Sequence, residues 1–302
     1  MAKKRKKSGW QALLSFVVVL LIAFGAWRGG LFGDGKKNPG RDTLPVEGTL
    51  EVHIVDVGQA DCTLLKCTAG NILIDAGDTA TKTEVVDYLK SVGVETLDYA
   101  IFTHPDADHI GGAATVIRSL KIKNVILPSL HESDVPTTKV YTNMLAALEE
   151  DESINVLPAQ AGKEYTLGEL KMKILAPLSE NYSNINDYSV SARFDFGATS
   201  FLFTGDALET SEKEMLREYA ASELKADFFQ AGHHGAKNAN TPDFIKAVSP
   251  SIVAVSCGKD NKYGHPTSEA LASYAAVGAT VYRTDELGTM IFVSDGKSIV
   301  KK

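Results

Sequence analysis

A ten-residue segment in the first half of the chain narrows the choice of folds and chemistry more than any other part. It runs Thr103-His104-Pro105-Asp106-Ala107-Asp108-His109-Ile110-Gly111-Gly112 and follows the apolar stretch 99–102, which is typical of a buried strand. Pro105 and the glycine pair predict a tight loop between this strand and a helix. Two His and two Asp within six residues can surround divalent cations at close range. We therefore expect a metal site where this strand ends.

The rest of the body is expected to alternate strands and helices in two halves, on either side of a β-rich middle. The pattern predicts strands at 50–57, 61–66, 71–75, 99–102, 124–127, 155–157, 164–167, 170–175, 189–196, 199–204, 226–230, 252–256, 280–283 and 289–293. It predicts helices at 82–92, 112–120, 138–150, 211–220, 241–248 and 267–277. Such a pattern indicates a layered α/β body.

The N-terminal region differs in character from this body. A basic cluster at 3–7 precedes the uncharged stretch 8–27, which is just long enough to cross a membrane as a helix. Residues 1–27 are predicted to be an uncleaved membrane anchor or a cleaved signal peptide, and both alternatives place the body outside the cytoplasm, tethered or secreted. Residues 28–47 are rich in Gly, Lys, Asp and Pro and are predicted to be a linker, which leaves 48–302 as one domain.

Charge and cysteine content limit the functional classes. The net charge is −7 although the N-terminal cluster is basic, so the body is more acidic still and no bulk attraction for nucleic acid is indicated. A local basic groove stays open as an alternative. Cys62 and Cys67 are expected on opposite faces of one strand, which argues against their pairing, and Cys257 is left over. We predict three unpaired thiols, and no protein partner is indicated.

The ligand-rich segment resembles the His-x-His-x-Asp-His signature of the metallo-β-lactamase fold, with Asp106 in place of the second His. Together with Asp56-Val57-Gly58-Gln59-Ala60-Asp61, this replacement resembles the extracellular metallo-hydrolase domain of ComEC-type competence proteins and its free-standing relatives. The similarity covers about residues 50–295. It continues through Asp75-Ala76-Gly77-Asp78, Asn186-Asp187-Tyr188-Ser189-Val190, Leu202-Phe203-Thr204-Gly205-Asp206, Gly232-His233-His234-Gly235, and Gly258-Lys259-Asp260-Asn261-Lys262-Tyr263-Gly264-His265-Pro266.

The resemblance implies an αββα sandwich with two divalent metal ions at one edge. The hydrophobic helix expected from the N-terminal sequence would precede it. By position, His104 and Asp106 would bind the first ion. Asp108 and His109 would bind the second ion.

The remaining ligands come from later segments. Asp206 would bridge the two ions, and either His233 or His234 would complete the second site. Asp75 would hold a ligand histidine by its other ring nitrogen.

The first site is rich in oxygen ligands. The family at large has a further His in mid-chain, whereas the matching stretch 186–190 has none here. Hard oxygen ligands favour Mn²⁺ or Mg²⁺ relative to Zn²⁺, or leave the first site weakly occupied. Zinc and manganese are thus both candidate ions.

Two divalent ions close together suit the hydrolysis of phosphodiesters. Asp108 and His265 are the candidate catalytic residues, and His265 could protonate the leaving oxygen. Five polar residues are candidates for binding the anionic ester: Ser189, Lys237, Lys259, Asn261 and Tyr263.

The substrate stays open between a DNA strand and a cell-surface phosphodiester, such as a phosphorylcholine-type decoration of wall polymers. The alternatives to a phosphodiesterase are a lactone or β-lactam hydrolase and a non-catalytic surface-binding module with a degenerate metal site.

The N-terminal stretch gives a test of location. If 8–27 is an uncleaved anchor, the full-length protein should fractionate with membranes, and protease added outside intact cells should digest the body. A mature N-terminus near residue 26 in the medium would favour a cleaved signal, and recovery as a soluble cytoplasmic protein would contradict both alternatives.

Overall fold

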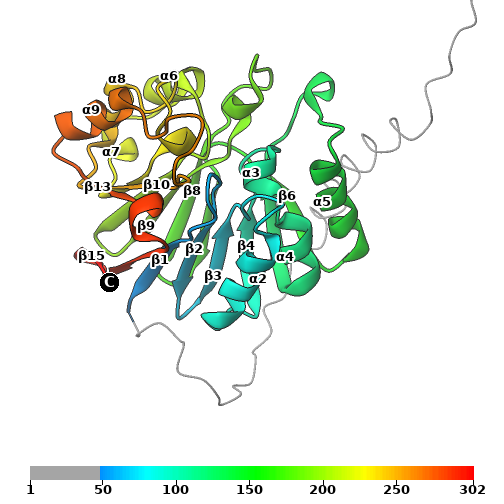
Figure 1. Ribbon diagram of the computed structural model, residues 1–302. Coiled ribbons are helices and arrows are strands. Elements are labelled where there is room, and N and C mark those ends of the chain that lie inside the picture. Colours follow the sequence, from blue (N-terminus) through cyan, green and yellow to red (C-terminus); the bar gives the residue numbers. More distant parts are fainter. Residues whose placement is uncertain (1–47) are drawn as a thin grey trace, which may run out of the picture.

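The antiparallel strand β1 (Leu50–Ile54) shows how apolar side chains position a strand between layers. Its Leu50, Val52 and Ile54 point into a core shared with a second sheet, while Glu51 and His53 point to the other face. The computed structural model describes residues 48–302, in which two mixed sheets pack face to face with helices on both outer surfaces (Figure 1). This is the expected αββα arrangement.

The first sheet has eight strands and is antiparallel from β15 to β3 and parallel from β3 to β6. Its order is β15 (Ile299–Lys301), β14 (Met290–Ser294), β1, β2 (Thr63–Cys67), β3 (Gly70–Ile74), β4 (Thr96–Ile101), β5 (Lys121–Leu127) and β6 (Asn155–Pro158).

The second sheet has seven strands and is parallel from β13 to β10 and antiparallel from β10 to β7. Its order is β13 (Thr280–Arg283), β12 (Ile252–Val255), β11 (Phe228–Gln230), β10 (Thr199–Phe203), β9 (Ser191–Phe196), β8 (Leu170–Ala176) and β7 (Glu164–Leu167).

Three apolar cores hold these layers together. One lies between the sheets, and the other two lie under the helices on either side. The first sheet is covered by α2 (Lys82–Ser91), α3 (Ala107–Ile110), α4 (Ala113–Ser119) and α5 (Lys139–Glu150). The second is covered by α6 (Glu209–Glu218), α7 (Ala221–Leu224), α8 (Pro242–Val248) and α9 (Ser268–Ala276). The connections include α10 (Thr284–Leu287) and the 3₁₀ turns η1 (Glu132–Asp134), η2 (Ile185–Tyr188) and η3 (Gly232–Gly235).

The predicted elements are found with shifted ends, and some short ones were not predicted. β4 and β5 each begin three residues earlier than expected, and β15 was not expected. The loop predicted after residue 102 contains α3, a single helical turn. Cys62 and Cys67 lie in different cores and all three cysteines are free, which confirms the predicted unpaired thiols.

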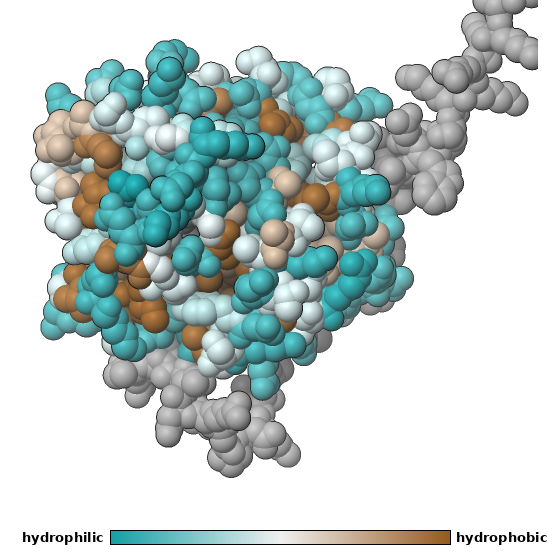
Figure 2. Space-filling model, viewed as in Figure 1, coloured by the Kyte–Doolittle hydropathy of each residue, from teal (hydrophilic) through white to brown (hydrophobic). Residues whose placement is uncertain are grey.

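The expected N-terminal helix and linker lie outside the described residues. Within 48–302, no helix has both the length and the apolar character needed to cross a membrane. The face of the body shown in Figure 2 is mainly hydrophilic, with apolar residues in small groups between polar ones.

The core between the sheets gives a stability prediction. Phe228 on β11 is fully buried, and its ring centroid lies 5.0 Å from that of Phe292 and 5.6 Å from that of Phe201. Phe228→Ala should lower the free energy of unfolding by about 3–5 kcal/mol, because the lost transfer free energy adds to the cost of a cavity. Val300→Ala, at a side chain that is 58% exposed, should change the free energy of unfolding by less than about 0.5 kcal/mol. Urea titrations of the two variants and the wild type measure both effects. Equal effects of the two changes would contradict this account of the core.

Candidate metal centre

The candidate ligands gather where parallel strands end. Asp75 follows β3, His104 follows β4, Asp206 follows β10, and the His233-His234 pair follows β11. Carboxyl ends of parallel strands meet at one edge of a sheet, so these segments converge. At Gly205, where φ is +51°, a Cβ atom would lie 2.8 Å from the Cβ of Thr103, so only glycine allows the two sheet edges to approach this closely.

Asp206 lies at the middle of four imidazoles. Its Oδ1 lies 3.1 Å from Nε2 of His109, and its Oδ2 lies 3.9 Å from Nε2 of His104. The same Oδ2 lies 3.5 Å from Nε2 of His233 and 4.0 Å from Nε2 of His234. This position fits the bridging carboxylate that the sequence analysis expected.

The donor atoms fall into two groups that suit a cation. One is His104, His109 and Asp206, and the other is Asp108, His109 and His234; in each, the ligand atoms lie within 4.8 Å of one another. A third group of the same kind, Asp61, Asp75 and His109, lies behind them, where His109 Nδ1 already bonds to Asp75. His104 Nε2, His109 Nε2 and Asp206 Oδ1 are buried and make no hydrogen bond of acceptable geometry, although the last two atoms lie 3.1 Å apart. Buried polar atoms left unpaired are costly, and bound divalent cations would satisfy them. The residues therefore fit a metal centre.

Two expected ligands lie less centrally. Asp106 lies outside both groups: its Oδ2 is 3.8 Å from Nε2 of His104, and its side chain is 47% exposed. Of the His pair, His234 is buried and belongs to a group, whereas His233 is 23% exposed and does not.

Buried hydrogen bonds fix which nitrogen each histidine presents. His109 Nδ1 donates to Asp75 Oδ2 at 2.7 Å, because a carboxylate only accepts. The Thr103 hydroxyl gives its one hydrogen to the same Oδ2, so it accepts from His104 Nδ1 at 3.1 Å. His234 Nδ1 donates to the carbonyl oxygen of Ser256 at 3.0 Å. All three rings therefore turn Nε2 toward the centre, and Asp75 holds His109 by its other ring nitrogen.

A second supporting carboxylate, Asp61, was not predicted from the sequence. Asp61 is buried, and its Oδ1 lies 3.4 Å from Nδ1 of His234. Its Oδ2 accepts from Gln230 Nε2 at 2.9 Å, and Gln230 Oε1 accepts from the Thr63 hydroxyl at 2.7 Å. Asp61 stood in a quoted motif, but only the tertiary contact with His234, far along the chain, shows its role.

The His233-His234 turn is held in an unusual conformation. Both residues have positive φ, 49° and 54°, which is uncommon outside glycine. The buried Asn240 stabilises the turn, because its side chain accepts from Gly232 N at 2.9 Å and donates to Gly232 O at 2.8 Å. Glu212 in turn accepts from Asn240 N and Thr241 N. No local sequence signal indicated these two supports.

Charges in the cluster depend strongly on one another. Burial alone would raise the pKa of Asp206, but His109 and His234 hold it well below its usual range. Burial alone would lower the pKa of His109, yet Asp206 and Asp75 raise it well above its usual range. Burial, with neighbouring His109, lowers the pKa of His104 to about 3. An ionised Asp206 among imidazoles is therefore favoured.

The rim of the site agrees only in part with expectation. Lys237, Lys259 and Tyr263 are exposed, as substrate-binding groups need to be. Ser189 is fully buried, and its hydroxyl accepts from Asp206 N at 3.1 Å, so it supports Asp206 and is not exposed for contact with a substrate. The Asn261 amide bonds to Gly258 O and to the backbone of His265, so it holds its own loop together.

The ring of His265 lies close to the rings of His233 and His234. Its centroid lies 5.7 Å from that of His233 and 6.4 Å from that of His234. The pKa of His265 is lowered to about 4, mainly because the ring is partly buried and also because His233 and His234 lie nearby.

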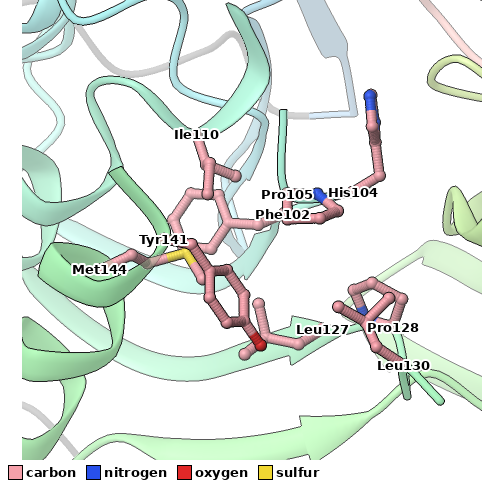
Figure 3. A pocket seen from close by; sticks show the side chains of 9 residues that line it. All are labelled: Phe102, His104, Pro105, Ile110, Leu127, Pro128, Leu130, Tyr141 and Met144. Carbon is pink, nitrogen blue, oxygen red and sulfur yellow. The ribbon is translucent and has the colours of Figure 1, made fainter. Parts of the chain in front are cut away.

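A small apolar pocket adjoins the centre but does not belong to it. It is lined mainly by apolar side chains, including Phe102, Leu127, Tyr141 and Met144. His104 borders this pocket, yet its ring points away from it (Figure 3). The residues that line the pocket therefore form an apolar layer behind His104.

Comparison with known families agrees with this geometry. Residues 55–259 match the model of the metallo-beta-lactamase superfamily. The chain belongs to this superfamily. It is also similar to competence-related members: ComE operon protein 3 of Bacillus subtilis is 29% identical over 258 residues, which cover 80% of this chain and 32% of that protein. Competence protein ComA of Neisseria gonorrhoeae is 26% identical over 247 residues, covering 82% of this chain and 32% of that protein.

Recombination protein 2 of Haemophilus influenzae is 28% identical over 223 residues, covering 72% of this chain and 25% of that protein. The chain thus spans about a third or less of the length of these curated relatives. Among solved structures, the metallo-beta-lactamase fold protein YhfI from Bacillus subtilis is 13% identical with a TM-score of 0.54, covering 82% of this chain and 99% of that one. CmlA, a diiron β-hydroxylase from Streptomyces venezuelae, is 15% identical with a TM-score of 0.53, covering 80% and 53%. These two likenesses show the superfamily fold alone.

The position of Asp206 gives a metal-binding prediction. The wild-type protein should bind two divalent ions, and Asp206→Ala should lose metal in elemental analysis while circular dichroism shows the fold retained, because Asp206 faces both donor groups. Asp195→Ala removes a carboxylate that pairs with Arg193 and should keep the full metal content. Binding of two ions by the Asp206 variant would remove Asp206 as the bridge.

Proposed function

We propose that this chain is an extracytoplasmic metal-dependent phosphodiesterase that hydrolyses a DNA strand or a cell-surface phosphodiester. The observation that carries the proposal is the buried cluster in which Asp206 lies among the Nε2 atoms of His104, His109 and His234. Two divalent ions bound there would activate water near neutral pH and stabilise charge on the reacting oxygens. Zinc and manganese are the candidate ions, and the first site, with His104 and the peripheral Asp106, is the weaker one.

The rim supplies groups that suit an anionic ester. Lys237 and Lys259 are exposed on two neighbouring loops and would attract the phosphate. Asp108 has a side chain that is 35% exposed, and its Oδ2 lies 3.3 Å from Nε2 of His234. We propose that Asp108 holds the attacking water on this partly exposed side of the cluster.

His265 is proposed to donate to the leaving oxygen. It lies above the His pair, in the loop that also carries Lys259. Because burial and the neighbouring His233 and His234 lower its pKa to about 4, the free His265 ring is neutral. A bound anionic ester would raise this pKa and favour the protonated imidazolium, which would give its proton to the leaving oxygen and return to the neutral ring.

The relatives support the nucleic-acid alternative only indirectly. Two of the relatives are named a recombination protein and a competence protein, the third is ComE operon protein 3, and this chain matches a third or less of each. Transport of DNA is therefore not part of the proposal. The location outside the cytoplasm, with the membrane as a partner through 8–27, rests on the N-terminal sequence.

The reaction is tested with the purified full-length chain and several divalent metals. We expect hydrolysis of bis-p-nitrophenyl phosphate and of at least one natural phosphodiester, single- or double-stranded DNA among them, and none of a β-lactam. Turnover of β-lactams or lactones, with no phosphodiester cleaved under any metal, would show that the proposal is wrong. Metal binding without any turnover would favour a binding module.

The role of His265 gives a sharper prediction. His265→Ala should reduce kcat on a phosphodiester with a poor leaving group by about 10²–10⁴-fold, with metal content unchanged. The loss should shrink for p-nitrophenolate, which needs little protonation as it leaves. His131→Ala, at an exposed histidine in the loop before η1, is the matched control and should keep wild-type kcat. An equal loss on good and poor leaving groups would make His265 a positioning residue.

A further inference from the structure

The loop from Gly258 to Pro266 carries a row of rings that leads away from the metal centre. The rings of His234 and His265 lie 6.4 Å apart with planes at 23°. The rings of His265 and Tyr263 lie 5.7 Å apart with planes at 25°. Tyr263 is the outermost ring and is 57% exposed. The row therefore begins at a candidate metal ligand and ends in an aromatic face open to solvent.

The loop that carries this row is held in place. Asn261 Nδ2 donates to the carbonyl oxygens of Gly258 and His265 at 3.0 and 2.6 Å, and Asn261 Oδ1 accepts from His265 N at 3.0 Å. Gln59, from the loop after β1, accepts from Gly258 N at 3.0 Å. The backbone that carries the outer ring is thus held in place before any ligand binds, which lowers the entropic cost of binding.

The charges around the outer ring select among planar and cationic ligands. Lys262 Nζ lies 5.0 Å from the centroid of the Tyr263 ring, and Lys259 is exposed in the same loop. Quaternary ammonium groups are bound by cages of several aromatic rings. Here there is one outer ring, and the positive charge of Lys262 already lies over it, so this surface does not suit such a ligand. A nucleobase stacks on an aromatic face with more binding free energy than an exposed cation–π contact provides, so it would displace the lysine. The displaced ammonium would then be free to pair with a phosphate.

We infer that Tyr263 is a specificity-determining residue, which stacks an unpaired nucleobase next to the scissile phosphodiester. In a duplex, each base already has neighbours on both faces, so the ring would select single-stranded nucleic acid. This inference rests on the proposed phosphodiesterase function and names the feature of the substrate that the loop reads.

Binding to two matched strands tests the inference without turnover. Fluorescence anisotropy of the full-length chain in EDTA at low salt compares a short labelled oligothymidylate with an abasic strand of equal phosphate number. The wild type should bind the base-bearing strand more tightly. Tyr263→Ala should weaken binding of that strand by about 5- to 100-fold and leave the abasic strand unaffected, while Tyr263→Phe and Tyr263→Trp keep the preference.

Lys259→Ala is the control for charge and should weaken both strands alike. An equal loss of both strands on Tyr263→Ala, no loss at all, or a wild type that does not distinguish the strands would overturn the inference. The proposed function is tested separately by the turnover assay, in which a wild type that cleaves no phosphodiester with any metal would contradict it.

Discussion

The Asp75 carboxylate is the contact on which the metal centre depends. It is buried at the end of β3 and accepts from the backbone N–H of Thr103 at 2.8 Å, from the Thr103 hydroxyl and from His109 Nδ1. The first contact fixes the end of β4 against the end of β3. The others orient His109 directly and His104 through the hydroxyl. One buried carboxylate thus sets both the path of the ligand segment and the nitrogen that each of its histidines presents.

A second set of hydrogen bonds links the two sheets and orients another histidine. Asp61 and Thr63 belong to the first sheet region, and Gln230 is the last residue of β11 in the second. Gln230 bonds to both of them, and Asp61 lies beside Nδ1 of His234. Because a half-satisfied buried network is costly, these contacts fix the register of the sheet edges as well as the ring of His234.

These supports explain how an acidic body can hold so many histidines at one point. Without neighbours, burial would favour neutral imidazoles and a protonated carboxyl. Instead, Asp206 on one side and His109 and His234 on the other stabilise each other's charged forms, so the site keeps its ionised carboxylate. Cations that replace the imidazole protons would be held by the same carboxylate. The lysines and the ring of Tyr263 lie outside this core, on the rim.

The sequence by itself determined the layered α/β fold, most elements within a few residues, and the segment His104–His109, because these depend on local periodicity and on ligands close together in the chain. Motif resemblance added Asp75, Asp206 and the His pair. Only the tertiary structure decided that Ser189 lies behind Asp206, that Asp106 lies at the margin, and that Asp61 and Asn240 support the later histidines. The physical reason is distance along the chain: Asp61 and Gln230 are 169 residues apart, and no local pattern encodes a hydrogen bond that forms only when two sheets pack together.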